Sequence, residues 1–254
     1  MSTVVEARQP GARSWLTLVV CEAKMVVRDT AGLVVPVLLP LLILVMSAGS
    51  ASAHVAGGFT ALEAYVLPLV LTMVLASIGV INMPSFLAYY RRTGILRRLA
   101  VTPASPAMVL VAQVVVSMLQ ALVGLAGALA VAFLAFDARP PADLGAAFAV
   151  YGLAMLALYA VGMIVAAVAP TPNSAVAIGL ITFFALGALG GMFGGSASLP
   201  DAVAAVGELT PFGAAVAGLS AAWVGAGVDP VHLVSLAVST LVGVVTASLL
   251  FRWD

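Results

Sequence analysis

The sequence predicts an all-α, polytopic membrane protein with six transmembrane helices. Of its 254 residues, 63% are hydrophobic and only 8% are charged, and its mean hydropathy is +1.21. Such a chain has too little polar surface to coat a soluble globule. Several apolar runs reach about 20 residues, the length at which a helix crosses the roughly 30 Å hydrocarbon core of a bilayer. Runs such as 121–136 are apolar on every side, whereas the strands of a membrane barrel alternate, so the spans are expected to be helical.

The N-terminal segment, residues 1–30, is expected to hold a cytoplasmic tail and a helix in the membrane interface. It contains four of the ten Lys and Arg residues, namely Arg8, Arg13, Lys24 and Arg28. From Arg13 onward, polar residues recur on one helical face and apolar residues fill the other. This pattern predicts an amphipathic helix whose basic side chains face anionic lipid headgroups. A plain solvated tail before the first span is the alternative.

Six apolar runs give the predicted spans, which are 33–48, 65–87, 107–136, 144–169, 175–193 and 231–251. The first contains Pro36 and Pro40, which would kink or break a helix unless neighbouring groups satisfy the carbonyls they free. The small residues 51–53 after this run match the A-x-A pattern of a signal-peptide cleavage site. We favour a span, because the segment before the run is far longer than the n-region of a signal peptide.

Between the fifth and the last run, residues 194–229 fit neither an ordinary span nor a solvated loop. The segment is rich in Gly and Ala, and with Pro200 and Pro211 it is broken too often for a full span. It is also too apolar for a loop in water. We therefore predict an outer re-entrant region, a hairpin that enters the membrane and returns to the same side while packed against other helices.

The basic residues predict the orientation of the chain. With the N-terminus in the cytoplasm, nine of the ten basic residues lie inside and only Arg139 lies outside. The positive-inside rule therefore favours six crossings with both termini cytoplasmic. These residues are confined to short segments and form no patch for nucleic acid, so membrane lipid is the expected polyanionic surface. Arginine greatly outnumbers lysine, and Ala, Val and Gly are abundant, which suggests the plasma membrane of a bacterium.

The most informative segment is 89–103, the only charged interruption between Asp29 and Asp137 apart from Glu63. It combines four arginines with a glycine, two leucines and a proline, namely Arg91, Arg92, Gly94, Leu96, Arg97, Arg98, Leu99 and Pro103. A short amphipathic helix here would present its leucines to a partner while the arginines hold it at the membrane interface. A loop whose arginines only anchor it on the inner side is the alternative.

This segment resembles one in a known family. Gly94-Ile95-Leu96-Arg97-Arg98-Leu99 with Thr102-Pro103-Ala104-Ser105-Pro106 is similar to the cytoplasmic segment between the second and third helices of type-2 ABC transporter permeases, which include antibiotic exporters. Where that family usually has an acidic residue near the start of the segment, this chain has Tyr89 and Tyr90. A second stretch also follows the family's order: Gly190-Gly191-Met192-Phe193, Leu199-Pro200 and Thr210-Pro211-Phe212.

The resemblance implies a domain organisation and partners. Residues 1–254 would form a single permease domain, and 89–103 would couple it to a nucleotide-binding ATPase subunit. A second copy of the permease, or a similar permease, would complete the transporter. ATP and Mg²⁺ would bind to the ATPase subunit, and this chain would bind no cofactor. The residues that match the outer hairpin of the family are Gly190, Gly191, Pro200 and Pro211.

The chain itself shows no signal for catalysis. A phosphate-binding loop needs G-x-x-x-x-G-K-[ST], and the only lysine, Lys24, follows Ala23. No close G-x-S-x-G motif indicates a serine hydrolase, and no catalytic residue or metal-ligand set is predicted. The predicted function is export driven by a separate ATPase. An ion-gradient-driven secondary exporter is the alternative, although such carriers usually place ionisable residues in mid-span and none is found there.

Three uncharged polar residues fall within the third run. Gln113, Ser117 and Gln120 are spaced by four and three, which places them on one face of a helix. They would either line a substrate pathway or hydrogen-bond to neighbouring helices, and the sequence leaves both open. Because no charge is expected within the spans, the composition suits a hydrophobic substrate, drug-like or lipid-like, better than a sugar polymer or an ion.

Overall fold

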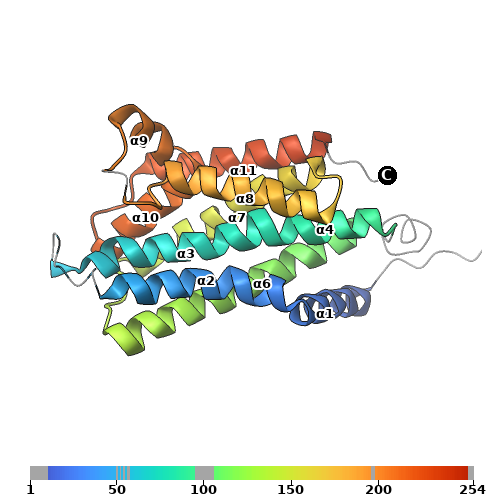
Figure 1. Cartoon of the computed structure of the whole chain (residues 1–254), viewed down its shortest axis with the longest axis horizontal. Helices are drawn as coiled ribbons and strands as arrows, with labels where there is room; N and C mark the ends of the chain where they lie inside the picture. Colours follow the sequence, from blue (N-terminus) through green and yellow to red (C-terminus); the bar gives the residue numbers. More distant parts are fainter. Residues whose placement is uncertain are drawn as a thin grey trace, which may run out of the picture.

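In the computed structural model the membrane-crossing helices run side by side along the long axis of the molecule (Figure 1). The structure describes residues 11–49, 51, 53, 55, 58–94, 106–195 and 198–250. Its α-helices are α1 (Ala12–Arg28), α2 (Thr30–Ala48), α3 (Leu67–Ala76), α4 (Met83–Arg92), α6 (Pro106–Phe136), α7 (Leu144–Val168), α8 (Pro172–Leu189), α9 (Asp201–Glu208), α10 (Pro211–Val224) and α11 (Pro230–Leu250). Two π-helical segments, η2 (Leu62–Val66) and η3 (Ser77–Asn82), directly precede α3 and α4.

The predicted all-α fold with six membrane-spanning helices is confirmed. Six described helices are long and apolar enough to cross a bilayer, namely Thr30–Ala48, Leu62–Arg92, Met108–Phe136, Leu144–Val168, Pro172–Leu189 and Pro230–Leu250. Five of them lie within a few residues of the predicted runs, because the length of an apolar run sets the length of a span. The second span is longer than predicted, since it covers 62–92 instead of 65–87.

The second span stays continuous because a wide turn precedes each of its prolines. Ala64 in η2 and Val80 in η3 stand four positions before Pro68 and Pro84. In a regular α-helix, a proline ring clashes with the carbonyl four residues earlier. A π-helical turn holds an extra residue and gives that carbonyl room. Together η2, α3, η3 and α4 therefore form one rod from one end of the bundle to the other (Figure 1).

Helix α2 continues through Pro36 because two other spans satisfy the carbonyl that this proline frees. A proline has no N–H, so the carbonyl four residues earlier loses its helical donor. Here that carbonyl belongs to Gly32, and it accepts hydrogen bonds from Asn82 Nδ2 at 2.8 Å and Gln120 Nε2 at 2.7 Å. Asn82 Nδ2 also donates to Gln120 Oε1 at 3.2 Å, so the two amides and the carbonyl form one network.

The second proline of α2, Pro40, is accommodated in the same way. It frees the carbonyl of Pro36, which accepts a hydrogen bond from Ser77 Oγ at 2.9 Å. Both freed carbonyls thus find a polar side chain on a neighbouring span, which is the condition under which a membrane helix tolerates proline. The break that these prolines would otherwise cause does not occur, and α2 is continuous from Thr30 to Ala48.

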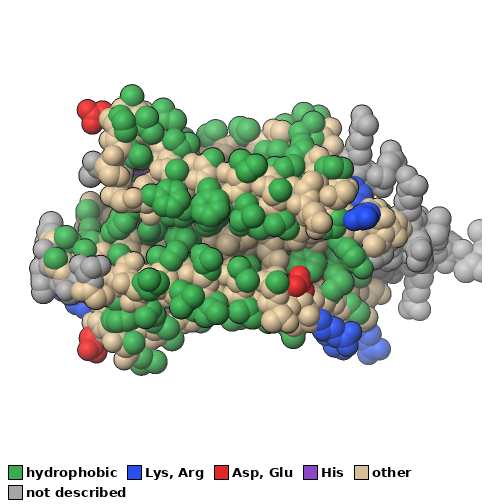
Figure 2. All heavy atoms as spheres, viewed as in Figure 1, with side chains coloured by type: hydrophobic (Ala, Val, Ile, Leu, Met, Phe, Trp, Pro, Cys, Tyr) green, Lys and Arg blue, Asp and Glu red, His purple; other side chains and the backbone are tan. Residues whose placement is uncertain are grey.

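The second span forms the centre of the bundle. Its most apolar window is 78% buried, compared with 22% for α2 and for α8 and 17% for α11. The outer helices instead display apolar side chains on their surface, as Figure 2 shows for one face. Leu134 on α6 and Leu249 on α11 are at least four-fifths exposed. Exposed apolar side chains of this kind are expected where a helix contacts lipid tails.

The two ends of the bundle differ in charge (Figure 2). The end that holds α1, the C-terminal end of α4 and the α7–α8 link is called the basic end, and the opposite one the acidic end (Figure 1). At the basic end the described Lys and Arg residues are Arg13, Lys24, Arg28, Arg91 and Arg92. At the acidic end the described carboxylates are Glu63, Asp137, Asp143, Asp201, Glu208 and Asp229, and the one described Lys or Arg residue is Arg139.

Helix α1 packs against the bundle through the predicted apolar face. Val26 is buried, and Leu18, Val19 and Met25 are partly buried against the core. The basic residues of this helix point outward and are exposed. The helix thus has the two faces expected from the sequence, while its position in a membrane interface stays a prediction.

The predicted re-entrant region contains two helices that meet at a sharp bend. The axes of α9 and α10 differ by 84° at the break between them. Thr210 caps α10, since its Oγ1 accepts a hydrogen bond from Gly213 N at 3.1 Å. The carbonyl of Leu209 accepts a hydrogen bond from Ser235 Oγ, which holds the bend against α11. The return of this region to the same membrane side stays a prediction.

Candidate functional site

An apolar groove runs along the bundle between α2 and α8, on the face shown in Figures 1 and 2. Its volume is about 510 Å³, and its floor is the central second span. The walls and floor include Val35, Leu39 and Ile43 of α2, Leu69, Met73 and Ile81 of the second span, and Val176, Leu180, Phe183 and Phe184 of α8. A cavity of this size with mostly apolar walls is typical of a site for a small hydrophobic molecule.

Four polar side chains also line the groove, and all of them hydrogen-bond to backbone groups. Asn82 and Ser77 donate to the two carbonyls freed by the prolines of α2. Ser85 Oγ donates to the carbonyl of Asn82 at 2.7 Å, and Asp29 Oδ1 accepts from Gly32 N at 3.1 Å. Because these groups are engaged with the helices, they maintain the shape of the groove and add little polar surface to it.

Aromatic rings line the part of the groove nearer the acidic end. Phe183 and Phe184 meet edge to face with centroids 5.3 Å apart, and Phe184 stacks on Phe193 at 6.4 Å. Phe193 and Met192 follow the end of α8 and line the groove with them. Such rings offer large apolar surfaces at a low cost in conformational entropy. This part of the groove therefore suits flat or bulky apolar groups.

At the basic end, a buried carboxyl joins α1 to the second span. Glu22 is 6% exposed and accepts a hydrogen bond from the hydroxyl of Tyr90 in α4. Burial raises the pKa of the Glu22 carboxyl above its ordinary value, and the hydrogen bond from Tyr90 opposes this rise. The sequence pattern did not single out Glu22, although an acidic residue on the apolar face of an amphipathic helix was the available signal.

The predicted coupling residue Arg91 lies at the same end and binds the end of α7. Its guanidinium donates to the carbonyl of Ala167 at 3.3 Å and to that of Ala169. These carbonyls belong to the last turn of a helix, where backbone acceptors lack helical partners and a cation is favourable. Arg91 therefore ties the C-terminal end of α4 to the α7–α8 link.

Two further predicted coupling residues mark where α4 ends. Arg92 is exposed in its last turn, and Gly94 has a φ of +68°, the left-handed conformation that commonly ends a helix at a glycine. The remaining predicted coupling residues lie outside the described residues, and they are Leu96, Arg97, Arg98, Leu99 and Pro103.

The three polar residues predicted on α6 are all buried on one side of that helix. Gln120 is engaged with α2 as described above, and Tyr159 donates to the carbonyl of Ser117 at 2.7 Å. The two polar side-chain atoms of Gln113, Oε1 and Nε2, are buried and, within the described part of the chain, have no hydrogen-bond partner. None of the three lines the groove between α2 and α8. Gln120 contacts neighbouring helices and also lines a separate apolar groove bordered by α1, α2 and α6, and a pathway role for these residues stays a prediction.

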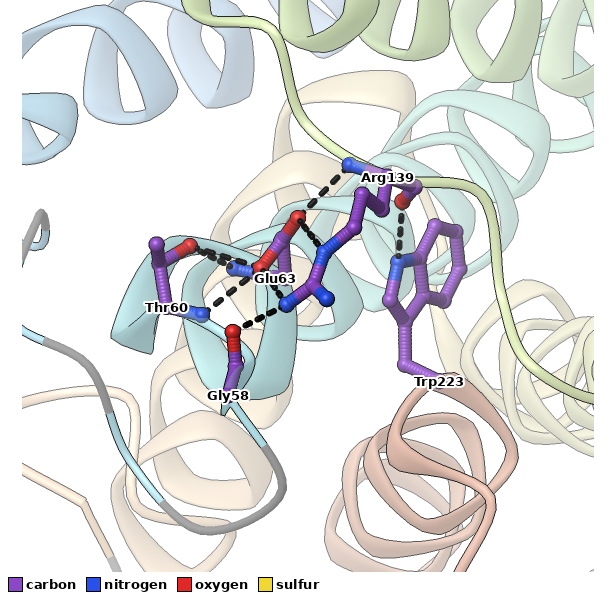
Figure 3. Close-up of polar contacts among 5 residues, drawn as sticks. All are labelled: Gly58, Thr60, Glu63, Arg139 and Trp223. Carbon is purple, nitrogen blue, oxygen red and sulfur yellow. Dashed lines mark hydrogen bonds and ion pairs between the residues drawn. The ribbon is translucent and has the colours of Figure 1, made fainter.

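At the acidic end, an ion pair between a buried carboxylate and a half-exposed arginine holds three parts of the chain together (Figure 3). Glu63 is 2% exposed and accepts hydrogen bonds from Thr60 N at 2.6 Å and from Arg139 N at 2.6 Å. The guanidinium of Arg139 also bonds Glu63, with Nε 3.2 Å from Oε1. Trp223 Nε1 of α10 donates to the carbonyl of Arg139 at 3.1 Å. Glu63 thus lies at the acidic end with its side chain buried, and its position on the outer side of the membrane stays a prediction.

The predicted hairpin residues delimit the helices of this region. Gly190 is the C-cap of α8, and Gly191 has a φ of +81°. Pro200 is the N-cap of α9, and Pro211 is the first residue of α10, where its missing N–H costs no hydrogen bond. The motif-like spacing seen in the sequence therefore corresponds to helix boundaries. In the described ranges, no group of three or more His, Cys, Asp or Glu residues is placed to hold a metal ion.

Most of the sequence matches a known family. Residues 53–252 match the model of a family described as ABC-2 family transporter protein. The match includes the second to sixth spans, the α9–α10 region and the segment 89–103, while α1 and α2 precede it. No curated protein matches the chain.

Proposed function

Because the chain belongs to the ABC-2 family of transporter proteins, we propose that it is the membrane-spanning subunit of an ATP-driven exporter. ATP is hydrolysed by a separate subunit that docks at the basic end, which faces the cytoplasm of a bacterium. The substrate is a hydrophobic molecule, drug-like or lipid-like, and it moves outward. The chain is a multi-pass membrane protein and a component of a transporter, and the proposal adds the energy source, the direction and the substrate class to these facts.

The groove between α2 and α8 is the observation that supports this proposal most. Its walls are mostly apolar, and Asn82 and Ser77 are already engaged with backbone carbonyls, so a hydrophobic molecule that binds away from the exposed Asp29 carboxylate displaces water from few polar atoms. The groove is open along one side of the bundle. A second permease chain facing the same side would close it, and two grooves together would form a pathway.

The contacts at the basic end supply a route by which an ATPase could move this pathway. The C-terminal end of α4 is joined to α1 through Tyr90 and to the α7–α8 link through Arg91. The same rod continues as the floor of the groove. Force applied to 89–103 would therefore shift α1, the second span and α7 together, as in rigid-body switching between two states.

Co-purification tests the ATPase partner. Leu96→Glu with Leu99→Glu should abolish recovery of an ATPase subunit in mild detergent, because two carboxylates would replace the apolar contact. The matched control is Val203→Glu with Val206→Glu, two exposed apolar residues on α9 at the acidic end, which should leave recovery unchanged. Failure to recover any ATPase with the unmodified chain would contradict the proposal. Transport that needs no partner and collapses with an ionophore would establish the gradient-driven alternative.

The groove is tested in the same preparation by ATP-dependent transport into vesicles. Leu39→Trp fills the groove, and transport should fall severalfold while the ATPase is still recovered. Leu42→Trp places the same ring on an exposed position of α2 that does not line the groove, and transport should be retained. Equal transport by the two variants would exclude the groove as the pathway.

A further inference from the structure

The second apolar groove, bordered by α1, α2 and α6, is called the α1 groove. Its volume is about 430 Å³, and Ala23, Val26 and Val27 of α1 line the part of it nearest the basic end. It shares no lining residue with the groove between α2 and α8, and the two lie on opposite faces of α2. The α1 groove is therefore a separate feature of the surface.

The α1 groove has the direction and the depth of a lipid chain in one leaflet. Its long walls are α2 from Leu33 to Leu41 and α6 from Val116 to Val123, and both helices run along the long axis of the bundle (Figure 1). At 1.5 Å per residue the wall on α2 is about 12 Å long. One leaflet supplies half of the roughly 30 Å hydrocarbon core, so this wall covers most of its depth.

The walls of the α1 groove are apolar and open to the surroundings. Val27 of α1 and Leu119 and Val123 of α6 are at least half exposed. Gln120 also lines the groove, but its amide is engaged, since Nε2 donates to the carbonyl of Gly32 and Oε1 accepts from Asn82 Nδ2. A hydrocarbon chain therefore covers Gln120 without depriving its amide of a partner.

A basic face of α1 borders the α1 groove. Val27 stands four positions after Ala23 and three after Lys24, so on the helix surface it lies between the face that lines the groove and the basic face. Lys24 and Arg28 are exposed, and Lys and Arg side chains gather at α1 in Figure 2. Side chains of this length reach past their own helix position to a neighbouring headgroup.

The nearby carboxylates do not cancel this positive charge. Glu22 is buried and accepts a hydrogen bond from Tyr90, and Asp29 lines the groove on the opposite face of α2. The C-terminal end of α1 and the N-terminal end of α2 meet at Asp29, so their opposite partial charges offset each other. The charge beside the α1 groove is therefore that of Lys24 and Arg28.

We propose that the α1 groove binds one anionic phospholipid of the adjoining leaflet, with an acyl chain along α2 and α6 and the phosphate at Lys24 and Arg28. Ammonium and guanidinium groups donate hydrogen bonds and accept none, and phosphate oxygens accept them. A phospholipid joins such an anionic head to a chain that fits the apolar walls. The site goes beyond the proposed export function, because it lies on the other face of α2 and binding is measured without an ATPase.

The test of the headgroup uses the purified, delipidated full chain in detergent, titrated with phosphatidylglycerol or with phosphatidylcholine of the same acyl chains. Native mass spectrometry counts the bound lipids. Phosphatidylglycerol should saturate at one lipid per chain and bind about tenfold more tightly than phosphatidylcholine. Arg28→Gln should weaken its binding about fivefold, because each basic residue near an anionic headgroup contributes about 1 kcal/mol. Lys24→Gln with Arg28→Gln should weaken it more than about tenfold.

Arg13→Gln is the matched control for the headgroup. It removes the same charge from the same helix at an exposed position about 15 Å along the axis from Ala23, so binding should be unchanged. Equal losses in Arg13→Gln and Arg28→Gln would overturn the proposal, since they would show attraction to the general charge of α1. Equal binding of the two lipids would also overturn it, because the headgroup would then not be recognised.

The acyl chain is tested by filling the α1 groove. Leu38→Trp places a large ring in it and should weaken phosphatidylglycerol binding severalfold. Leu42→Trp adds the same ring one turn later on α2, at a position that lines neither groove, and should leave binding unchanged. Both leucines are about half exposed, so neither substitution disturbs the core.

Three results of this experiment would overturn the acyl-chain site. Full binding by Leu38→Trp would show that the chain lies elsewhere. Binding that rises with lipid concentration without saturating would show only the annular lipid that surrounds any membrane protein. Lipid bound by the monomer and lost from a dimer would assign the α1 groove to a contact with a second copy of the chain.

Discussion

The prolines of α2 show what single polar side chains do inside this bundle. Each proline frees one carbonyl, and each carbonyl is bound by a side chain from a neighbouring span. In lipid no water can replace these partners, so the hydrogen bonds protect both the helix and its contacts. Gln120 has such a role, whereas Gln113, seven residues earlier on the same helix, has no partner within the described residues.

This difference predicts opposite effects of one substitution at two positions. Gln120→Leu should destabilise the fold by about 1 kcal/mol, because Gly32 and Asn82 each lose a hydrogen-bond partner. Gln113→Leu should be neutral or stabilising, because a buried amide without a partner is replaced by an apolar side chain of similar size. Thermal unfolding in detergent measures both. A larger loss for Gln113→Leu than for Gln120→Leu would contradict this account.

The burial of Glu63 is a residue-scale feature that the sequence could not predict. Its ion-pair partner, Arg139, lies 76 positions away in the link between two other helices. Periodicity describes one helix at a time and gives no information on which loops meet. The available signal was indirect, since Arg139 is the one basic residue predicted on the outer side and Glu63 is the one acidic residue between Asp29 and Asp137.

At the scale of the elements, close backbone contact joins α7 to the central span. A Cβ added at Gly162 would lie 1.8 Å from the carbonyl oxygen of Gly79 in η3. The two helices therefore touch through backbone atoms, as small residues allow in membrane bundles. Gly152, on the same helix, has nothing within 4 Å of an added Cβ.

The two glycines of α7 therefore predict opposite responses to alanine. Gly162→Ala should lower the free energy of unfolding by about 1 to 3 kcal/mol, because the helices must move apart to admit the methyl group. Gly152→Ala should raise it by up to about 1 kcal/mol, because alanine favours a helix and the position is open. Unfolding of both variants under the same conditions provides the comparison, and a stable Gly162→Ala protein would refute the close contact.

The elements were predictable in different degrees for physical reasons. Apolar run length gave five spans to within a few residues, because the bilayer fixes that length. The second span was predicted too short at both ends, because its helix continues beyond the apolar run, through Glu63 at one end and through Arg91 and Arg92 at the other. For the candidate site, the resemblance to type-2 ABC permeases predicted the family correctly, but the groove depends on which spans lie side by side.

At the scale of the whole molecule, charge divides the bundle into two ends. Among the described residues, Lys and Arg gather at the basic end, and six carboxylates lie at the acidic end with Arg139. From the positive-inside rule we expect the basic end to face the cytoplasm. Thr93 and Ala202 are exposed residues at the two ends, and changing them leaves the charge unaltered.

Labelling of single cysteines tests this orientation. Cys21, which is exposed, is first changed to Ser, and Thr93→Cys or Ala202→Cys is then introduced. In intact cells a membrane-impermeant maleimide should label Ala202→Cys, whereas Thr93→Cys should react only after permeabilisation, because the reagent cannot reach the cytoplasmic side. The reverse pattern would invert the molecule and place the proposed ATPase site outside.

The π-helical turn η3 sets the direction in which the later side chains of the second span point. Successive residues of a helix point about 100° apart, so the number of residues in a turn sets the direction of every later side chain. The extra residue in 77–82 therefore sets the rotation about the helix axis between two groups of side chains. The first group lines the floor of the groove, and the second is Tyr90 and Arg91, which contact α1 and α7. Deleting a single residue there would leave the composition nearly unchanged, yet it would turn Tyr90 away from Glu22 and Arg91 away from α7.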